Sequence, residues 1–177
     1  MRSVSWVTWC CAVITGFIGA APSFAESDSK TVRVSATILP RLELSITPDT
    51  GQEIAFGAIR QPARGEEAAQ SVKVNVNVFS NLGRPYHVTQ MIRRPLTNVE
   101  GRTIPDAQFR VTTRDASRGQ LGSPQPTPLA PGAATTLYTS DERGKSEQFF
   151  ADYTLTVTPQ TPAGEFDTEI VYTVTSL

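Results

Sequence analysis

The chain is poor in the side chains that most often carry catalysis or bind metals. Its 177 residues include one histidine, two cysteines and two tryptophans. Both cysteines and both tryptophans lie within the first 11 residues, in a segment that has the features of a cleaved leader. The remainder then holds no thiol and no indole, which excludes disulfides, cysteine catalysis and zinc sites built from histidine and cysteine.

The amino terminus has the pattern of a secretory signal peptide. A positive start, Met-Arg, precedes a largely apolar run at residues 4–21, and residues 21–25 (Ala-Pro-Ser-Phe-Ala) end in the small-x-small pattern that signal peptidase requires. We therefore predict a signal peptide over residues 1–25, cleavage before Glu26 and one domain over residues 26–177. Such a protein would be periplasmic, secreted or attached to the cell surface.

Two other kinds of leader agree less well with these residues. A lipoprotein signal needs a small residue directly before its cysteine, but Trp9 precedes Cys10. A retained membrane anchor needs about 20 apolar residues, and Ser5, Thr8 and Thr15 interrupt this run. We therefore expect no membrane span after cleavage. Export without disulfides is reasonable, because a domain of about 150 residues buries enough surface to be stable without them.

Alternation of apolar and polar residues dominates the chain and predicts half-buried strands. In residues 71–79 we expect four valines to face the core and three polar residues to face solvent: Val72, Val74, Val76 and Val78 against Lys73, Asn75 and Asn77. The same pattern predicts further strands at residues 32–38, 42–46, 86–92, 109–111, 153–158 and 170–174.

Turn-forming residues separate these strands, and no segment has a helical pattern apart from a single turn at residues 66–70. Asparagine, glycine and proline favour turns at residues 80–85, 99–102, 141–144 and 161–164. Short strands joined by turns predict an all-β protein, a single antiparallel immunoglobulin-like β-sandwich of about 7–9 strands.

Residues 114–133 form a long segment rich in proline and glycine, with four prolines and three glycines. Proline cannot donate a hydrogen bond to a strand ladder, so we expect extended backbone here and no central strand. Loops of this length are either flexible or functional. Two interpretations remain, a flexible surface excursion and a contact loop at one end of the sandwich.

No catalytic constellation is recognisable, and we predict no catalytic residue, no cofactor and no metal ligand. The only imidazole, His87, is expected to be a surface or edge histidine, and no serine lies in a nucleophile-elbow pattern. Residues 49–53, and Asp141 and Glu142 with Glu147, offer oxygen ligands without the spacing of a calcium loop. Basic residues are not interleaved with aromatic ones, so nucleic acid is not an expected partner.

Charge is small in sum and uneven along the chain. The formal net charge is −1, or −2 without Arg2, which predicts no bulk attraction to nucleic acid or to anionic membranes. Residues 84–118 carry seven arginines against three acids, whereas residues 141–177 carry seven acids against two basic residues. These segments could meet between molecules or fold against each other, but solvated faces are the more common outcome.

Two segments resemble parts of secreted bacterial pilin-like proteins, the spore-coat-U and fimbrial subunits. Residues 153–175, YTLTVTPQTPAGEFDTEIVYTVT, are similar to the strand, Ala-Gly turn and final tyrosine-bearing strand of these proteins. Residues 32–38, followed by Ile-Ala-Phe-Gly at residues 54–57, resemble their first strand and apolar-x-Phe-Gly element. These families usually carry a disulfide near the first strand, which this chain lacks. WxL-type wall-binding domains have a similar tail, but their defining tryptophan is absent here.

The resemblance implies a non-enzymatic structural or adhesive subunit of the bacterial envelope or of a surface appendage. Its partners would be other copies, envelope proteins or a periplasmic chaperone. The alternative is a stand-alone module that binds carbohydrate or protein, although Tyr86, Tyr153 and Tyr172 occupy inward strand positions and only Tyr138 is open to form a platform. A hydrolase is the least favoured class.

In pilin-like subunits a sandwich lacks one strand and accepts it from a neighbour or a chaperone. After cleavage only residues 26–31 would precede the alternating segment at residues 32–38. That segment is therefore either the donated strand itself or a strand of its own sandwich. We expect the second arrangement, because Leu39 and Pro40 join it closely to the strand at residues 42–46.

Overall fold

The computed structural model describes residue 30 and residues 32–177. The predicted signal peptide, its cleavage site and both cysteines lie outside the described residues. The chain divides into two units, residues 1–37 and residues 38–177, and the second contains every strand that the structure describes. No helix in the described part is both long and apolar enough to cross a membrane.

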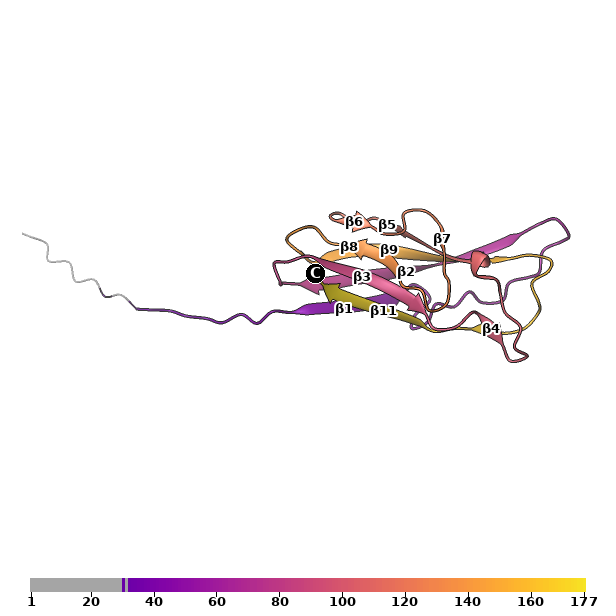
Figure 1. Cartoon of the computed structure of the whole chain (residues 1–177), viewed down its shortest axis with the longest axis horizontal. Coiled ribbons are helices and arrows are strands. Elements are labelled where there is room, and N and C mark those ends of the chain that lie inside the picture. The colour runs from indigo at the N-terminus through magenta and orange to yellow at the C-terminus, as the bar shows by residue number, and fades with distance from the viewer. Residues whose placement is uncertain (1–29, 31) are drawn as a thin grey trace, which may run out of the picture. The chain divides into compact units, whose positions relative to one another are not determined.

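Residues 38–177 fold into an all-β sandwich of antiparallel strands, as the alternation predicts (Figure 1). Seven strands have five or more residues and four have two, so the 11 strands exceed the expected number only through very short ones. A 3-10 helix, η1 (Asp106–Gln108), is the only helix in the described residues. The strands are β1 (Leu42–Pro48), β2 (Ala68–Ser80), β3 (Tyr86–Ile92), β4 (Thr97–Asn98), β5 (Phe109–Arg114), β6 (Gln120–Leu121), β7 (Thr127–Pro128), β8 (Thr135–Thr139), β9 (Glu147–Val157), β10 (Phe166–Asp167) and β11 (Ile170–Ser176).

Two sheets enclose the core between them. One has the strand order β1-β2-β9-β5-β7 and the other has the order β11-β3-β8-β6, while β10 and β4 form a separate pair. Aromatic side chains from both sheets meet in the core: Tyr138 of β8 stacks on Phe149 of β9 with ring centroids 5.1 Å apart. Tyr86 of β3 lies 6.0 Å from Tyr138. The long central strands therefore supply the core with their alternate residues.

Strand β2 has the orientation that its sequence predicts. Val74 and Val76 are fully buried and Val72 and Val78 nearly so, whereas Lys73 is exposed and the two asparagines are half-buried. β-branched valines favour extended backbone, and a shift of register by one residue would move all four out of the core. The pattern of the sequence thus specifies both the strand and its inward face.

The predicted strand at residues 32–38 does not form in this structure. Residues 32–41 lie outside every strand, and the side chains of Val32, Val34 and Ile38 are more than four-fifths exposed. The expectation that this segment pairs within its own sandwich is therefore wrong. Alternation makes a segment able to join a sheet, but the hydrogen bonds of a strand also require an accessible edge to pair with.

Strand β8 was not predicted, because its alternation of apolar and polar residues is interrupted. Leu137 and Tyr138 are adjacent and both are buried. The pairing of β8 with β3 shifts register between Val88 and Thr89, so Leu137 is an extra residue, as in a β-bulge. Strand β9 is longer than predicted and begins at Glu147, because β2 pairs with it over 11 residues.

The proline-rich segment at residues 114–133 is ordered against both sheets and is not a flexible excursion. Within it, β7 pairs with β5 of one sheet and β6 pairs with β8 of the other. Leu129 is 2% exposed, and its amide donates to the carbonyl of Phe109 at 3.0 Å. We call this side of the sandwich the closed edge, because one continuous segment covers the last long strand of each sheet there.

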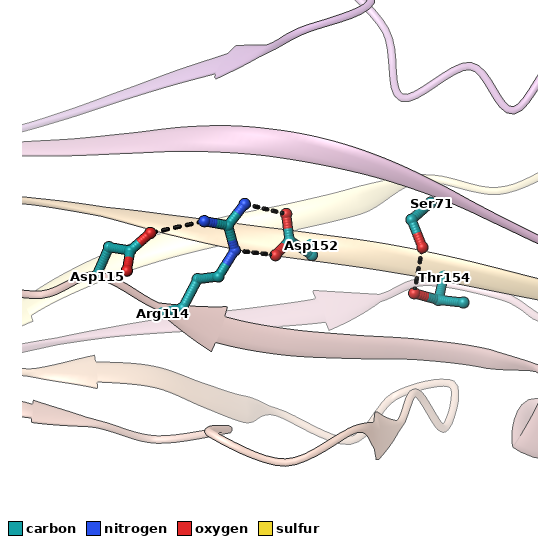
Figure 2. A network of polar contacts seen from close by, with 5 residues as sticks. All are labelled: Ser71, Arg114, Asp115, Asp152 and Thr154. Atoms are coloured by element: carbon teal, nitrogen blue, oxygen red, sulfur yellow. Dashed lines mark hydrogen bonds and ion pairs between the residues drawn. The ribbon is translucent and has the colours of Figure 1, made fainter.

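The two segments of opposite charge meet within the molecule. Arg93 pairs with Glu169 at 3.1 Å and Arg94 pairs with Asp167. On the outer face of the five-stranded sheet, Arg114 binds both oxygens of Asp152 (Figure 2). These pairs are mostly exposed to solvent and contribute little stability, at most about 1 kcal/mol each. The two segments of opposite charge thus pair within the molecule, while most of these side chains remain solvated.

Candidate functional site

The residues that the sequence offered as candidate ligands or acid–base groups lie apart in the structure or are held by structural hydrogen bonds. No group of three or more histidine, cysteine, aspartate or glutamate side chains in the described residues could hold a metal ion. His87 lies on β3 opposite Thr139 of β8 and Thr175 of β11, and it is half-buried. Glu147, one of the candidate calcium ligands, accepts hydrogen bonds from the backbone and hydroxyl of Ser117 and from the amide of Arg118. Its carboxylate therefore stabilises the closed edge by accepting hydrogen bonds from residues 117 and 118.

The described residues line a groove of about 1210 Å³ at one end of the sandwich, where the end of β1, the start of β11, the start of β5 and the end of β9 come together. It lies between the end of β1 and the start of β11, and part of the connection from β1 to β2 also lines it. Phe56 of that connection contacts Phe109 edge-on, with ring centroids 6.0 Å apart. Its apolar and aromatic lining residues include Ile46, Ile54, Phe56, Phe109, Ile170 and Tyr172.

The two strands beside the groove are the last strands of their sheets. β1 pairs only with β2 and β11 pairs only with β3, and no ladder joins β1 to β11 in the described residues. The two strands nevertheless lie next to each other. Each therefore presents a row of unpaired backbone N–H and C=O groups, which can accept a further strand. We call this side the open edge.

Burial falls sharply toward the open edge. Inward-facing residues of the central strands, such as Val76, Val88 and Phe149, are fully buried. The inward-facing residues of the two edge strands pack on the same core yet are only partly buried: Leu42, Leu44 and Ile46 of β1, and Ile170, Tyr172 and Val174 of β11. These six side chains therefore form the partly covered border of the core.

A polar cluster lies beside the groove. The hydroxyl of Tyr153 donates to Oε1 of Gln90 and shares a 2.7 Å hydrogen bond with the hydroxyl of Tyr172. Burial raises the pKa of Tyr172 to about 12, although the hydrogen bond to Tyr153 opposes this shift. Burial also raises the pKa of Tyr153 well above its usual value. Both phenols therefore stay protonated and uncharged at physiological pH.

A second unpaired apolar element of the chain is the N-terminal segment, which we define as residues 32–38. It lies outside every strand, and its alternate residues Val32, Val34 and Ile38 are 82%, 89% and 84% exposed. Arg33, Ser35 and Thr37 alternate with them. The described residues therefore contain both an open apolar groove and an exposed apolar segment with the period of a strand.

The tyrosines do not form a binding platform. Tyr138, which the sequence left open, is 1% exposed, and Tyr86 and Tyr153 are fully buried, as their inward positions predict. Aromatic platforms for sugars require exposed ring faces, and none of these three tyrosines offers one. That the β1–β2 connection lines a groove was not predicted from the sequence. The alternation of Ile54 and Phe56 was a signal of inward-facing side chains.

No protein-family model matches the chain, and no curated protein matches it.

Proposed function

We propose that this protein is a non-enzymatic, exported structural subunit of the bacterial cell envelope that assembles by strand exchange. The N-terminal segment of one copy would pair along β1 and β11 at the open edge of another, beside the groove. The proposal rests on two features of one chain, two unpaired strand edges with half-buried inward side chains and an exposed segment of alternating residues. This proposal replaces the expectation that residues 32–38 belong to their own sandwich.

The dimensions of the two elements agree. β1 and β11 are each seven residues long, and the N-terminal segment has seven residues. Strands rise about 3.3 Å per residue, so donor and acceptor edges would match over about 20 Å. An inserted strand would place residues 32, 34, 36 and 38 on one face, toward the half-buried side chains of β1 and β11. Arg33, Ser35 and Thr37 would face solvent.

Burial of apolar side chains would offset part of the cost of ordering the inserted segment. Fully burying a valine or isoleucine side chain contributes about 1.5–3 kcal/mol, and the segment offers three such residues together with Ala36. Backbone hydrogen bonds to the free edges would satisfy groups that otherwise bind water. Ordering the segment costs about 1–2 kcal/mol per residue, so tight binding requires the groove side chains and the edges together. This mode of recognition depends on backbone pairing for affinity and on alternate side chains for specificity.

A matched pair of substitutions tests the proposal. Val34→Asp places a charge on the face that would enter the groove, whereas Ser35→Asp places the same charge on the opposite face. Because both residues are exposed, neither change should disturb the isolated domain. We expect the exported wild-type protein and Ser35→Asp to form SDS-resistant ladders and high-mass species by light scattering. Val34→Asp should remain monomeric, because burying an unpaired carboxylate costs several kcal/mol.

A synthetic peptide of residues 32–38 provides the complementary measurement. Added to the Val34→Asp protein, which still has an empty acceptor groove, it should bind and raise the melting temperature. A peptide with the same composition and no alternation serves as the control. Equal assembly by the two Asp variants, or equal binding of the two peptides, would refute strand exchange between copies. Binding of the alternating peptide without any polymer of the wild-type protein would instead indicate donation by a different protein, such as a chaperone.

A further inference from the structure

We infer that the side chain of Asn81 acts as a clamp that directs the N-terminal segment to another copy instead of to the groove of its own chain. The inference rests on the proposed function and concerns residues 39–41, which join the segment to β1. It assigns a positioning role to a residue in the turn between β2 and β3.

Asn81 binds the backbone on both sides of Pro40. Its Oδ1 accepts a hydrogen bond of 2.6 Å from the amide of Arg41, and its Nδ2 donates one of 3.0 Å to the carbonyl of Leu39. The amide of Asn81 also donates to the carbonyl of Arg41 at 3.2 Å. One residue thus makes three hydrogen bonds to the linker, and two of them come from its side chain.

The pattern of these bonds continues the ladder between β1 and β2. Leu42 lies opposite Ser80 in that ladder, so Arg41 falls opposite Asn81 in the same register. Leu39 and Arg41 are two residues apart and direct their polar groups toward the same neighbour, as alternate residues of a strand do. The amide side chain of Asn81 therefore replaces a peptide group of β2 after that strand has turned away. The linker is held extended, in line with β1.

Two further features strengthen the clamp. Pro40 has a fixed φ near −65° and no amide hydrogen, which restricts the linker at its centre. The guanidinium of Arg41 lies 5.1 Å from the ring centroid of Phe79 and binds the carboxylate of Glu43 at 2.5 Å. The side chain of Arg41 is thereby held over β2, on the same strand that ends beside Asn81.

To insert into its own chain, the N-terminal segment would have to bend back along β1 instead of continuing in line with it. To lie antiparallel to β1 at its free side, the N-terminal segment would have to reverse direction within Leu39, Pro40 and Arg41. Three residues are enough for a hairpin loop, so chain length alone does not prevent this reversal. A reversal would, however, turn the carbonyl of Leu39 and the amide of Arg41 away from Asn81. The clamp thus opposes self-insertion and leaves the segment available to a second copy.

The substitution Asn81→Ala, compared with wild type and with Asn75→Ala, tests this inference. Asn75 is a half-buried asparagine on the outer face of β2, and it contacts only the side chain of Asn77 among the described hydrogen bonds. We expect Asn81→Ala to shift the ratio of self-inserted monomer to polymer by about tenfold, because two hydrogen bonds to the linker are lost. In the monomer, the amides of residues 32–38 should become protected from hydrogen exchange. Asn75→Ala should behave as wild type.

The exchange measurement separates the clamp from the proposed function. It uses dilute monomer, so it reports on self-insertion whether or not polymer forms. Segment amides that stay unprotected in folded Asn81→Ala, or that are already protected in monomeric wild type, would overturn the clamp. Wild-type protein that neither polymerises nor binds the alternating peptide would overturn strand exchange itself. Should Asn81→Ala fail to fold, Asn81→Asp keeps the acceptor for Arg41 and removes the donor to Leu39, and the same protection is expected in weaker form.

Discussion

The two lateral edges of this sandwich differ in how the last strands of the two sheets are covered. At the closed edge, residues 114–133 pair with the last long strand of each sheet through β6 and β7. At the open edge, β1 and β11 lie next to each other with no strand between them and with their inward side chains half-buried. The chain thus covers one pair of sheet edges with its own residues and leaves the other pair uncovered. In the proposed strand exchange, the uncovered pair is the one that accepts the segment of a second copy.

Polar contacts fix the closed edge in detail. Ser123 is 2% exposed; its amide donates to the hydroxyl of Thr113 at 3.1 Å, and its hydroxyl donates to the carbonyl of Thr136 at 3.1 Å. This serine joins β5 of one sheet to β8 of the other. Every buried polar group of such a bridge needs a partner, since an orphaned one costs about 1–3 kcal/mol. At the open edge, the hydroxyl of Tyr172 of β11 shares a 2.7 Å hydrogen bond with that of Tyr153 of β9, but no loop segment covers the two strands among the described residues.

The largest effect is expected from a change in the core that both edges share. Val76→Asp should unfold the domain, because Val76 is fully buried between the sheets and an unpaired buried charge costs several kcal/mol. Asn75→Asp, on the other face of β2, should change stability by no more than about 0.5 kcal/mol. Denaturant unfolding of the two variants measures this difference. Similar losses of stability would mean that the inward face of β2 is assigned wrongly.

Two glycines with the same backbone conformation allow the edges to be compared directly. Gly119, before β6, has φ +66°, and Gly57, which lines the groove, has φ +65°. Both would be strained by an added Cβ, at about 1–2 kcal/mol. Only at Gly119 would the new atom also overlap the carbonyl oxygen of Thr139, whereas it meets nothing at Gly57.

We therefore expect Gly119→Ala to lose about 1–3 kcal/mol more stability than Gly57→Ala, as overpacking requires. Thermal or denaturant unfolding of both variants provides the measurement. Since Gly57→Ala leaves the closed edge intact, its remaining effect should be limited to backbone strain. A greater loss at Gly57 would reverse the comparison and show that the region of the groove is the more tightly packed side.

Glu147 tests how strongly the closed edge depends on one carboxylate. Replacing it with alanine removes charge-assisted hydrogen bonds to Ser117 and Arg118 and should cost about 1.5–3 kcal/mol. Gln148→Ala, at the next and exposed position of β9, is the control and should be nearly neutral. Amide hydrogen exchange should show the loss first in residues 114–133. Uniform loss of protection across the domain would instead mean that this segment does not open by itself.

The smallest effect concerns pH at the open edge. Tyr172 has a folded-state pKa of about 12 against a usual value of 10, chiefly because of burial. Its contribution to stability is present below pH 10 and is lost as the pH rises from 10 through 12, since the unfolded chain releases the proton first. Binding of the residue 32–38 peptide should cover Tyr172 further and raise its pKa. Spectrophotometric titration of tyrosine, with Tyr172→Phe to assign the signal, should show a shift to higher pH, and an unchanged titration would place the peptide elsewhere.

Much of this architecture was predictable from the sequence. Strict alternation identified β1, β2, β3 and β11 and the inward face of β2, because a period of two places every second side chain on one face. For two elements the prediction from the sequence was wrong or incomplete, and the reasons are physical. β8 contains a bulge that brings Leu137 and Tyr138 inward together, and the proline-rich segment gains its order from hydrogen bonds to both sheets. Neither feature is a property of the local sequence.

The sequence by itself determined that the chain is all-β, which faces its strands bury and which segments are able to pair. It could not determine which strands lie at the edges or which edges remain uncovered, because strand order depends on contacts between residues far apart in the chain. The N-terminal segment shows this limit most clearly. Its alternation is as regular as that of β2, yet β2 pairs with β1 and β9, whereas residues 32–38 lie in no strand of the described structure.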